Sequence, residues 1–222
     1  MTISLYTSTI HDGSMKPLHD TENALVSANR ETFLLHNAIN PADTTLVQIT
    51  YETDDFRRYF TLDDGARGDG ITRQATIEAD ALVVTKPNHA LLLPLADCIG
   101  AVIHDPTRDI LMLSHLGRHN LEQYGGTKSI EYLAAKHDCD PQDLTVWLSS
   151  AAGRDNYPLY TFDNRSLHDV ATEQLITAGV LVQNITTSPI DSAADTNYFS
   201  HSQFLAGNRD SDGRFAVVAA LR

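Results

Sequence analysis

The stretch that decides the fold is residues 91–117, LLLPLADCIGAVIHDPTRDILMLSHLG. Two apolar runs, residues 99–103 and 110–113, flank a turn-forming segment that contains Asp-Pro and a second Asp. This pattern predicts a strand, a tight turn and a second strand. A hairpin returns the residue before its first strand to the end of its second, so we expect Cys98 and His115 to be neighbours at one end of a sheet.

A thiol beside an imidazole suits two kinds of site. Cys98 and His115 could share a metal ion, since thiolate and imidazole are both zinc ligands. They could equally form a nucleophile and its general base. A third interpretation is structural, because free cysteine is among the most buried residue types and residues 91–95 supply an apolar setting. The spacing alone leaves all three open.

The rest of the chain predicts strands that outnumber helices. This favours an α/β (α+β) fold with mixed sheets, or two packed sheets, and helices outside. At 222 residues, one domain spanning 1–222 is the expectation. Strands are expected at residues 3–7, 44–50, 81–85, 90–95, 144–148, 180–185 and 215–221, helices at about 22–36, at 120–136 and from 164 or 166 to 178, and a loop or exposed hairpin at 54–74.

Composition restricts the partners. Lys and Arg number 16 against 29 Asp and Glu, a net charge of −13, so nucleic acid is not expected as a partner. There is no run of 18 or more apolar residues and no signal-peptide pattern, so we expect a cytoplasmic protein that does not enter a membrane. With two cysteines only, Cys98 and Cys139, a disulfide framework is not expected, and Cys139 is interpreted as a bystander at a helix end.

Several motifs together resemble the laccase-domain family, also called polyphenol oxidase-type. They match it in order and spacing, and looser matches extend the resemblance over nearly the whole chain. The motifs are Ala79-Asp80-Ala81-Leu82-Val83-Val84-Thr85, Ala96-Asp97-Cys98, Val102-Ile103-His104-Asp105-Pro106 and His115-Leu116-Gly117, with looser matches at Asn29-Arg30, residues 144–153, Phe199-Ser200 and Gly213-Arg214. The resemblance implies a layered α-β-β-α sandwich and zinc-dependent purine nucleoside phosphorylase or adenosine deaminase activity, with a purine nucleoside and phosphate as ligands.

The resemblance also implies a three-ligand zinc site, of which this chain keeps two members. The family's ligands are a His in a Gln-x-His motif, the Cys of Ala-Asp-Cys and the His of His-Ala-Gly-Trp-Arg-Gly. Here Thr50 stands where the first His is expected, and a hydroxyl is a poor zinc ligand. Cys98 and His115 remain, and His119 could complete the set if a helix placed it on one face with His115. The sequence after Gly117 is rewritten, and the family's Pro is absent from residues 149–153.

An anionic ligand would require a local basic pocket in such an acidic protein. Arg118, Arg154 and Arg214 are the arginines expected near the site, and Arg118 and Arg214 are the predicted substrate-binding residues. For each of them the simpler interpretation is pairing with surface carboxylates.

Three functional hypotheses follow from these patterns. The first is a purine nucleoside phosphorylase or deaminase with an eroded zinc site at Cys98 and His115, with His119 as the candidate third ligand. The second is a metal-free hydrolase or deamidase in which Cys98 is the nucleophile and His115 the base, as in deamidating toxins whose catalytic domain shares the family's fold. The third is a non-catalytic descendant that binds a ligand or partner. The intact Cys-His pair favours the first two, whereas Thr50 and Arg118 favour the third.

Overall fold

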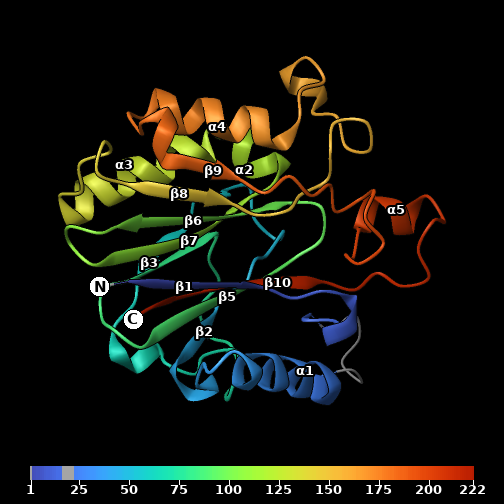
Figure 1. The fold of residues 1–222 in the computed structure, drawn as a ribbon, viewed down its shortest axis with the longest axis horizontal. Coiled ribbons are helices and arrows are strands. Elements are labelled where there is room, and N and C mark those ends of the chain that lie inside the picture. The colour runs from blue at the N-terminus through green and yellow to red at the C-terminus, as the bar shows by residue number, and fades with distance from the viewer. Residues whose placement is uncertain (1, 17–22) are drawn as a thin grey trace.

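The computed structural model describes residues 2–16 and 23–222, which form two sheets packed face to face with helices on both outer sides (Figure 1). One sheet has the strand order β1-β10-β5-β2 and the other the order β3-β4-β7-β6-β8-β9. Both mix parallel and antiparallel pairs, so the expected layered α-β-β-α arrangement is confirmed. The strands are β1 (Ile3–Thr7), β2 (Thr44–Leu46), β3 (Tyr59–Thr61), β4 (Ala81–Val84), β5 (His89–Leu95), β6 (Ile99–Asp105), β7 (Ile110–Leu116), β8 (Thr145–Leu148), β9 (Ile185–Thr187) and β10 (Phe215–Leu221); the helices are α1 (Asn23–His36), α2 (Arg118–Glu122), α3 (Gly125–His137), α4 (Leu167–Thr177) and α5 (His201–Leu205).

The predicted hairpin is present as β6 and β7. The two strands pair antiparallel along their whole length, and Gly100 lies opposite His115. Their turn is held by Asp105, whose Oδ1 accepts hydrogen bonds from the backbone N–H groups of Thr107 and Arg108 at 2.8 and 3.0 Å. A short carboxylate that bonds the backbone two residues on stabilises such a turn. The register therefore follows from local sequence.

The central core lies between the two sheets. In β5 the side chains of Leu91, Leu93 and Leu95 point into it, while Ala90 and Leu92 point to the opposite face of their sheet. This alternation is the period-two pattern of a strand, and both faces of β5 are buried. Helix α1 covers one outer face, and α2, α3 and α4 cover the other.

Some local expectations were wrong. The single helix expected at 120–136 is two helices, because Tyr124 adopts a left-handed backbone (φ 62°) between α2 and α3. Strand β2 ends at Leu46, the strand expected at 180–185 lies at β9, and α5 was not predicted. Residues 54–74 contain the short strand β3, which pairs parallel to β4.

No helix in the described ranges, residues 2–16 and 23–222, combines the length and apolar character needed to cross a membrane.

Candidate functional site

A cavity of about 1010 Å³ lies where β5 leads into β6 and β7 leads into α2. Every side chain predicted for the site lines it, namely Cys98, His115, Arg118, His119 and Arg214. Arg154, the third arginine expected nearby, is exposed and does not line it.

Gly117 lets Cys98 and His115 come together. A Cβ atom at Gly117 would lie 2.8 Å from Cys98 Sγ and 3.1 Å from His115 Nε2. Both atoms lie close to this Cβ position, so Cys98 Sγ and His115 Nε2 are separated by no more than the sum of the two distances, about 6 Å. The backbone of Gly117 is ordinary (φ −92°), so glycine is needed here for close approach. The predicted proximity of the pair is confirmed.

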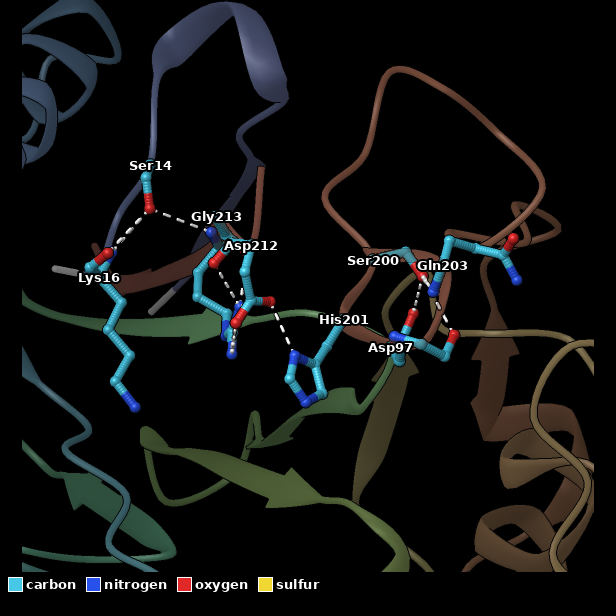
Figure 2. A network of polar contacts seen from close by, with 10 residues as sticks. Ser14, Lys16, Asp97, Ser200, His201, Gln203, Asp212 and Gly213 are labelled. Carbon is cyan, nitrogen blue, oxygen red and sulfur yellow. Dashed lines mark hydrogen bonds and ion pairs between the residues drawn. The ribbon is translucent and has the colours of Figure 1, made fainter. Parts of the chain in front are cut away.

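Asp97 positions the cysteine. Its backbone is left-handed (φ 76°), and its carbonyl oxygen accepts a hydrogen bond from Ala152 N at 2.8 Å. Its buried carboxylate accepts one from Ser200 Oγ and one from Ser202 N, each at 2.6 Å (Figure 2 draws Asp97 beside Ser200). Asp97 thus ties the loop before β6 to the start of α5.

A second buried network lies behind His115. The backbone N–H of His115 donates to the Asp80 carbonyl oxygen at 2.8 Å. The Asp80 carboxylate, which is fully buried, pairs with Arg58 Nε at 3.1 Å and accepts from Asn120 Nδ2 at 3.3 Å. Asn120 also accepts from Gly117 N at 3.2 Å. The imidazole is therefore held on a rigid backbone.

The Cys-His pair is uncharged at neutral pH. Burial, with the nearby Asp97 carboxylate, raises the pKa of the Cys98 thiol to about 12. Burial, with the positive charge of Lys16, lowers the pKa of His115 to about 3. His115 Nδ1 is buried and has no hydrogen-bond partner among the described residues. The pair therefore presents an uncharged sulfur atom and an uncharged imidazole ring to the cavity.

His119 does not complete a three-ligand set. It lies in α2 whereas His115 lies in β7, so the two imidazoles do not share a helix face. The His119 ring stacks on Phe56 with centroids 4.8 Å apart, and its Nδ1 lies 3.6 Å from Glu122 Oε2. In the part of the chain that the structure describes, no three His, Cys, Asp or Glu side chains are placed to hold a metal ion.

Thr50, at the position of the missing family His, does not face the cavity. Gln48, Ile49 and Tyr51 line it, but Thr50 does not, and Thr50 Oγ1 instead accepts a hydrogen bond from Glu52 N at 3.2 Å. Two donors are fewer than the three protein ligands of a catalytic zinc site. The described residues therefore do not fit a tightly held zinc ion, nor a group of several copper ions, whose sites are rich in imidazole.

The cavity also has a wall of cationic side chains, and sequence reasoning found only part of it. Lys16, Arg30 and Arg73 line it together with Arg118 and Arg214, and Asp97 is the one acidic side chain among the described lining residues. The signal for Arg30 was available, because it follows Val26 and precedes Phe33 at the spacing of the buried face of α1.

Asp212 organises the edge of this cationic wall. Its Oδ1 accepts from Arg214 Nη1 at 2.7 Å and pairs with His201 Nδ1 at 2.8 Å. Burial alone would raise the pKa of Asp212, but the hydrogen bonds from Arg214 and His201 outweigh it and lower the pKa. In Figure 2, Lys16 and His201 lie on either side of Asp212. His201, which lines the cavity, carried no role in the sequence analysis.

A known protein-family model matches more than half of the chain. Residues 16–164 match the family model described as multi-copper polyphenol oxidoreductase laccase. No functionally curated protein matches the sequence significantly.

Solved structures share the fold over the full length. The hypothetical protein YfiH of Bacillus licheniformis superposes with a TM-score of 0.85 at 21% identity, covering 99% of this chain and 93% of that one. YlmD from Geobacillus stearothermophilus gives 0.83 at 18% identity, covering 100% and 92%. A Neisseria meningitidis protein gives 0.74 at 15%, covering 99% and 94%.

Proposed function

Because the chain belongs to the family of multi-copper polyphenol oxidoreductase laccases, the laccase-domain family, we propose that its cavity binds a purine nucleoside and phosphate and turns them over slowly or not at all. One observation carries this proposal. Cys98 and His115 meet at a cavity of about 1010 Å³, while no third ligand joins them among the described residues. The ligand class follows from the family resemblance, and the low activity follows from the incomplete donor set.

The cavity offers suitable surfaces for a purine nucleoside. Its volume is at the upper end of the range for small-molecule pockets, roughly 300–1,000 Å³. Tyr51 and Tyr157 line it and provide flat faces for a purine ring, and Gln48 provides an amide group for its polar edge. The cationic wall suits the phosphate.

Zinc, as the family resemblance implies it, would be held by Cys98 and His115 and only weakly. A ligating cysteine must lose its proton, and burial raises the pKa of Cys98 to about 12, so the ion must overcome that cost with two protein ligands. We propose that dialysis against a chelator of moderate strength removes the metal, as elemental analysis would show. Stoichiometric zinc after dialysis would indicate a third ligand, and His119→Ala would then test whether it is His119.

The metal-free nucleophile receives less support. A cysteine nucleophile reacts as its thiolate, which an adjacent imidazole stabilises by taking the proton. Here burial opposes both charges, raising the pKa of Cys98 and lowering that of His115. An amide hydrolase with a cysteine nucleophile would need a lowered pKa for the thiol and a raised pKa for the imidazole.

The test combines binding and turnover on the purified protein. Calorimetry with adenosine and with inosine, each with phosphate, should show binding, and an assay with added zinc should show little phosphorolysis or deamination. Cys98→Ala should leave binding largely intact. Robust turnover that disappears in Cys98→Ala would contradict the proposed weakness of the site, and the absence of nucleoside binding would contradict the ligand class.

A further inference from the structure

We infer that His201, oriented by Asp212, accepts a hydrogen bond from a ribose hydroxyl group of the ligand and so determines which sugars the cavity prefers. The presence of a nucleoside in the cavity rests on the proposed function. The role of His201 rests on the orientation of its ring, on its free ring nitrogen and on its place between two parts of the cavity.

Asp212 determines which nitrogen of His201 carries a proton. His201 Nδ1 lies 2.8 Å from Asp212 Oδ1. Burial opposes the charge on Asp212, but the hydrogen bonds from Arg214 and His201 outweigh it and lower the pKa, so Asp212 is a carboxylate at neutral pH. A carboxylate only accepts hydrogen bonds, so Nδ1 must be the donor. In the neutral ring, Nε2 therefore carries the lone pair.

The carboxylate that orients His201 is itself held in place. Arg214 Nη1 donates to Asp212 Oδ1 at 2.7 Å and to the Asp212 carbonyl oxygen at 2.8 Å. The backbone N–H of Arg214 donates to Ser14 Oγ at 3.1 Å, which fixes this segment against the N-terminal part of the chain. An imidazole that is already oriented loses little further side-chain freedom when a ligand binds.

The second ring nitrogen of His201 is available to a ligand. The side chain lines the cavity and is 46% exposed, and its Nε2 has no hydrogen-bond partner among the described residues. In Figure 2 the far edge of the ring points away from Asp212, on the side toward which Lys16 extends. Lysine and arginine side chains have no acceptor atom. His201 thus offers a ligand hydroxyl the acceptor that the neighbouring cations lack.

His201 lies between the Cys-His pair and the cationic wall. It follows Ser200, whose Oγ donates at 2.6 Å to Asp97, the residue before Cys98. On its other side, the ring bonds Asp212 at the edge of the cationic wall. Figure 2 shows the same order, with His201 between Asp97 and Lys16.

This is the position expected for the sugar of the proposed ligand. Tyr157, one of the two flat faces proposed for the purine, lies near the thiol, because burial and then Cys98 raise the pKa of its hydroxyl. The phosphate belongs at the cationic wall. A ribose between the purine and the phosphate would lie beside His201, and its neutral hydroxyl groups are suitable donors to Nε2.

Calorimetry of the full chain at pH 8, without added zinc or phosphate, compares adenosine with its 2′-, 3′- and 5′-deoxy analogues. We expect one analogue to bind about three- to tenfold more weakly than adenosine, the range for a single neutral hydrogen bond. In His201→Ala, adenosine should lose the same factor and that analogue should lose nothing further. His36→Ala, which changes an exposed histidine outside the cavity, is the matched control and should alter neither affinity.

Nuclear magnetic resonance tests the positioning role of Asp212. Nitrogen-15 spectra distinguish the two neutral imidazole tautomers and should show the His201 proton on Nδ1. Asp212→Ala should move the proton toward Nε2 and weaken adenosine binding by a similar factor. Asp212→Asn, which keeps an acceptor oxygen, should keep both the tautomer and the affinity. An unchanged tautomer in Asp212→Ala would overturn the positioning role.

The remaining outcomes separate this inference from the proposed function. Equal binding of adenosine and all three analogues would overturn the role of His201 and leave the nucleoside pocket standing. A deficit of one analogue that persists unchanged in His201→Ala would do the same. If adenosine does not bind, the proposed function fails, and methyl β-D-ribofuranoside decides the inference alone. A shift of the His201 nitrogen signals by this riboside would support the inference, and the absence of a shift would overturn it.

Discussion

The two walls of the cavity treat charge in opposite ways. At the first, burial keeps Cys98 and His115 neutral, with pKa values of about 12 and about 3. At the second, Lys16, Arg30 and Arg214 gather positive charge in a protein whose net charge is −13. The comparison teaches that the Cys-His pair and the cluster of cations have separate structural origins. The neutral wall is carried by one hairpin and the loop before it, whereas the cationic wall needs three distant segments.

The largest expected effect on the free energy of unfolding comes from removing the carboxylate of Asp97, the residue before Cys98. Asp97→Ala leaves Ser200 Oγ and Ser202 N without their carboxylate partner and places alanine at φ 76°. Hydrogen bonds to charged groups contribute roughly 1.5–3 kcal/mol each, so urea unfolding should show a loss of about 3 kcal/mol. Asp97→Asn should lose less, because it keeps one acceptor oxygen and tolerates this backbone. A loss below ~1 kcal/mol for Asp97→Ala would show that α5 does not depend on this carboxylate.

Gly117→Ala should disrupt the packing of Cys98 against His115 by a steric clash. The added Cβ would lie 2.8 Å from Cys98 Sγ and 2.9 Å from His115 Cε1, which forces one side chain to move. Overpacking of this kind costs about 1–3 kcal/mol of unfolding free energy. Cys98→Ala in the same chain should recover part of that loss, as a double-mutant cycle would measure. Strict additivity of the two changes would mean that the thiol is not what the methyl group meets.

Acid should destabilise the protein through His115. Its pKa in the folded state, about 3, lies below the ordinary value of 6.5, so the unfolded chain binds the proton first as the pH falls. The stability that the neutral ring contributes is complete above pH ~6.5 and is lost at about 1.4 kcal/mol per pH unit as the pH falls toward 3. Urea midpoints at pH 7 and pH 5 should therefore differ more for the native chain than for His115→Gln. Equal differences would place the acid sensitivity elsewhere.

The smallest effect should have the opposite sign and lies at the cationic wall. Lys16→Ala removes a charge that Arg214 and Arg30 repel, so without ligand it should raise the unfolding free energy by a few tenths of a kcal/mol. High salt should reduce that gain by screening. Lys128→Ala, which loses an ion pair with Glu131, should gain nothing under the same conditions. Destabilisation by Lys16→Ala in low salt would mean that its charge is already compensated.

The same contrast explains what the sequence could predict. The proximity of Cys98 and His115 follows from an apolar run, a turn and an apolar run, which are all local. The order of such elements favoured a mixed sheet or two packed sheets with helices outside, and the family resemblance implied the layered α-β-β-α arrangement. Arg30 meets Lys16 and Arg214 only through tertiary hydrogen bonds, which no local period encodes. The position of Thr50 in the sequence indicated a lost ligand, but only the structure shows that its side chain bonds Glu52 instead of facing the cavity. The break between α2 and α3 was not predicted, because the left-handed backbone of Tyr124 is set by its tertiary context and not by the local sequence.

The central position of β10 has a consequence for the kinetics of folding. In its sheet β10 lies between β1 and β5, so residues 3–7 find their partner only at residues 217–221. Contacts of such long sequence separation slow folding, since the loop must close before any contact forms. During synthesis, the edges of β1 and β5 that pair with β10 stay exposed until β10, the last described strand, leaves the ribosome. Arg214 immediately precedes that strand, so we expect the cationic wall to form after the β6–β7 hairpin has brought Cys98 and His115 together.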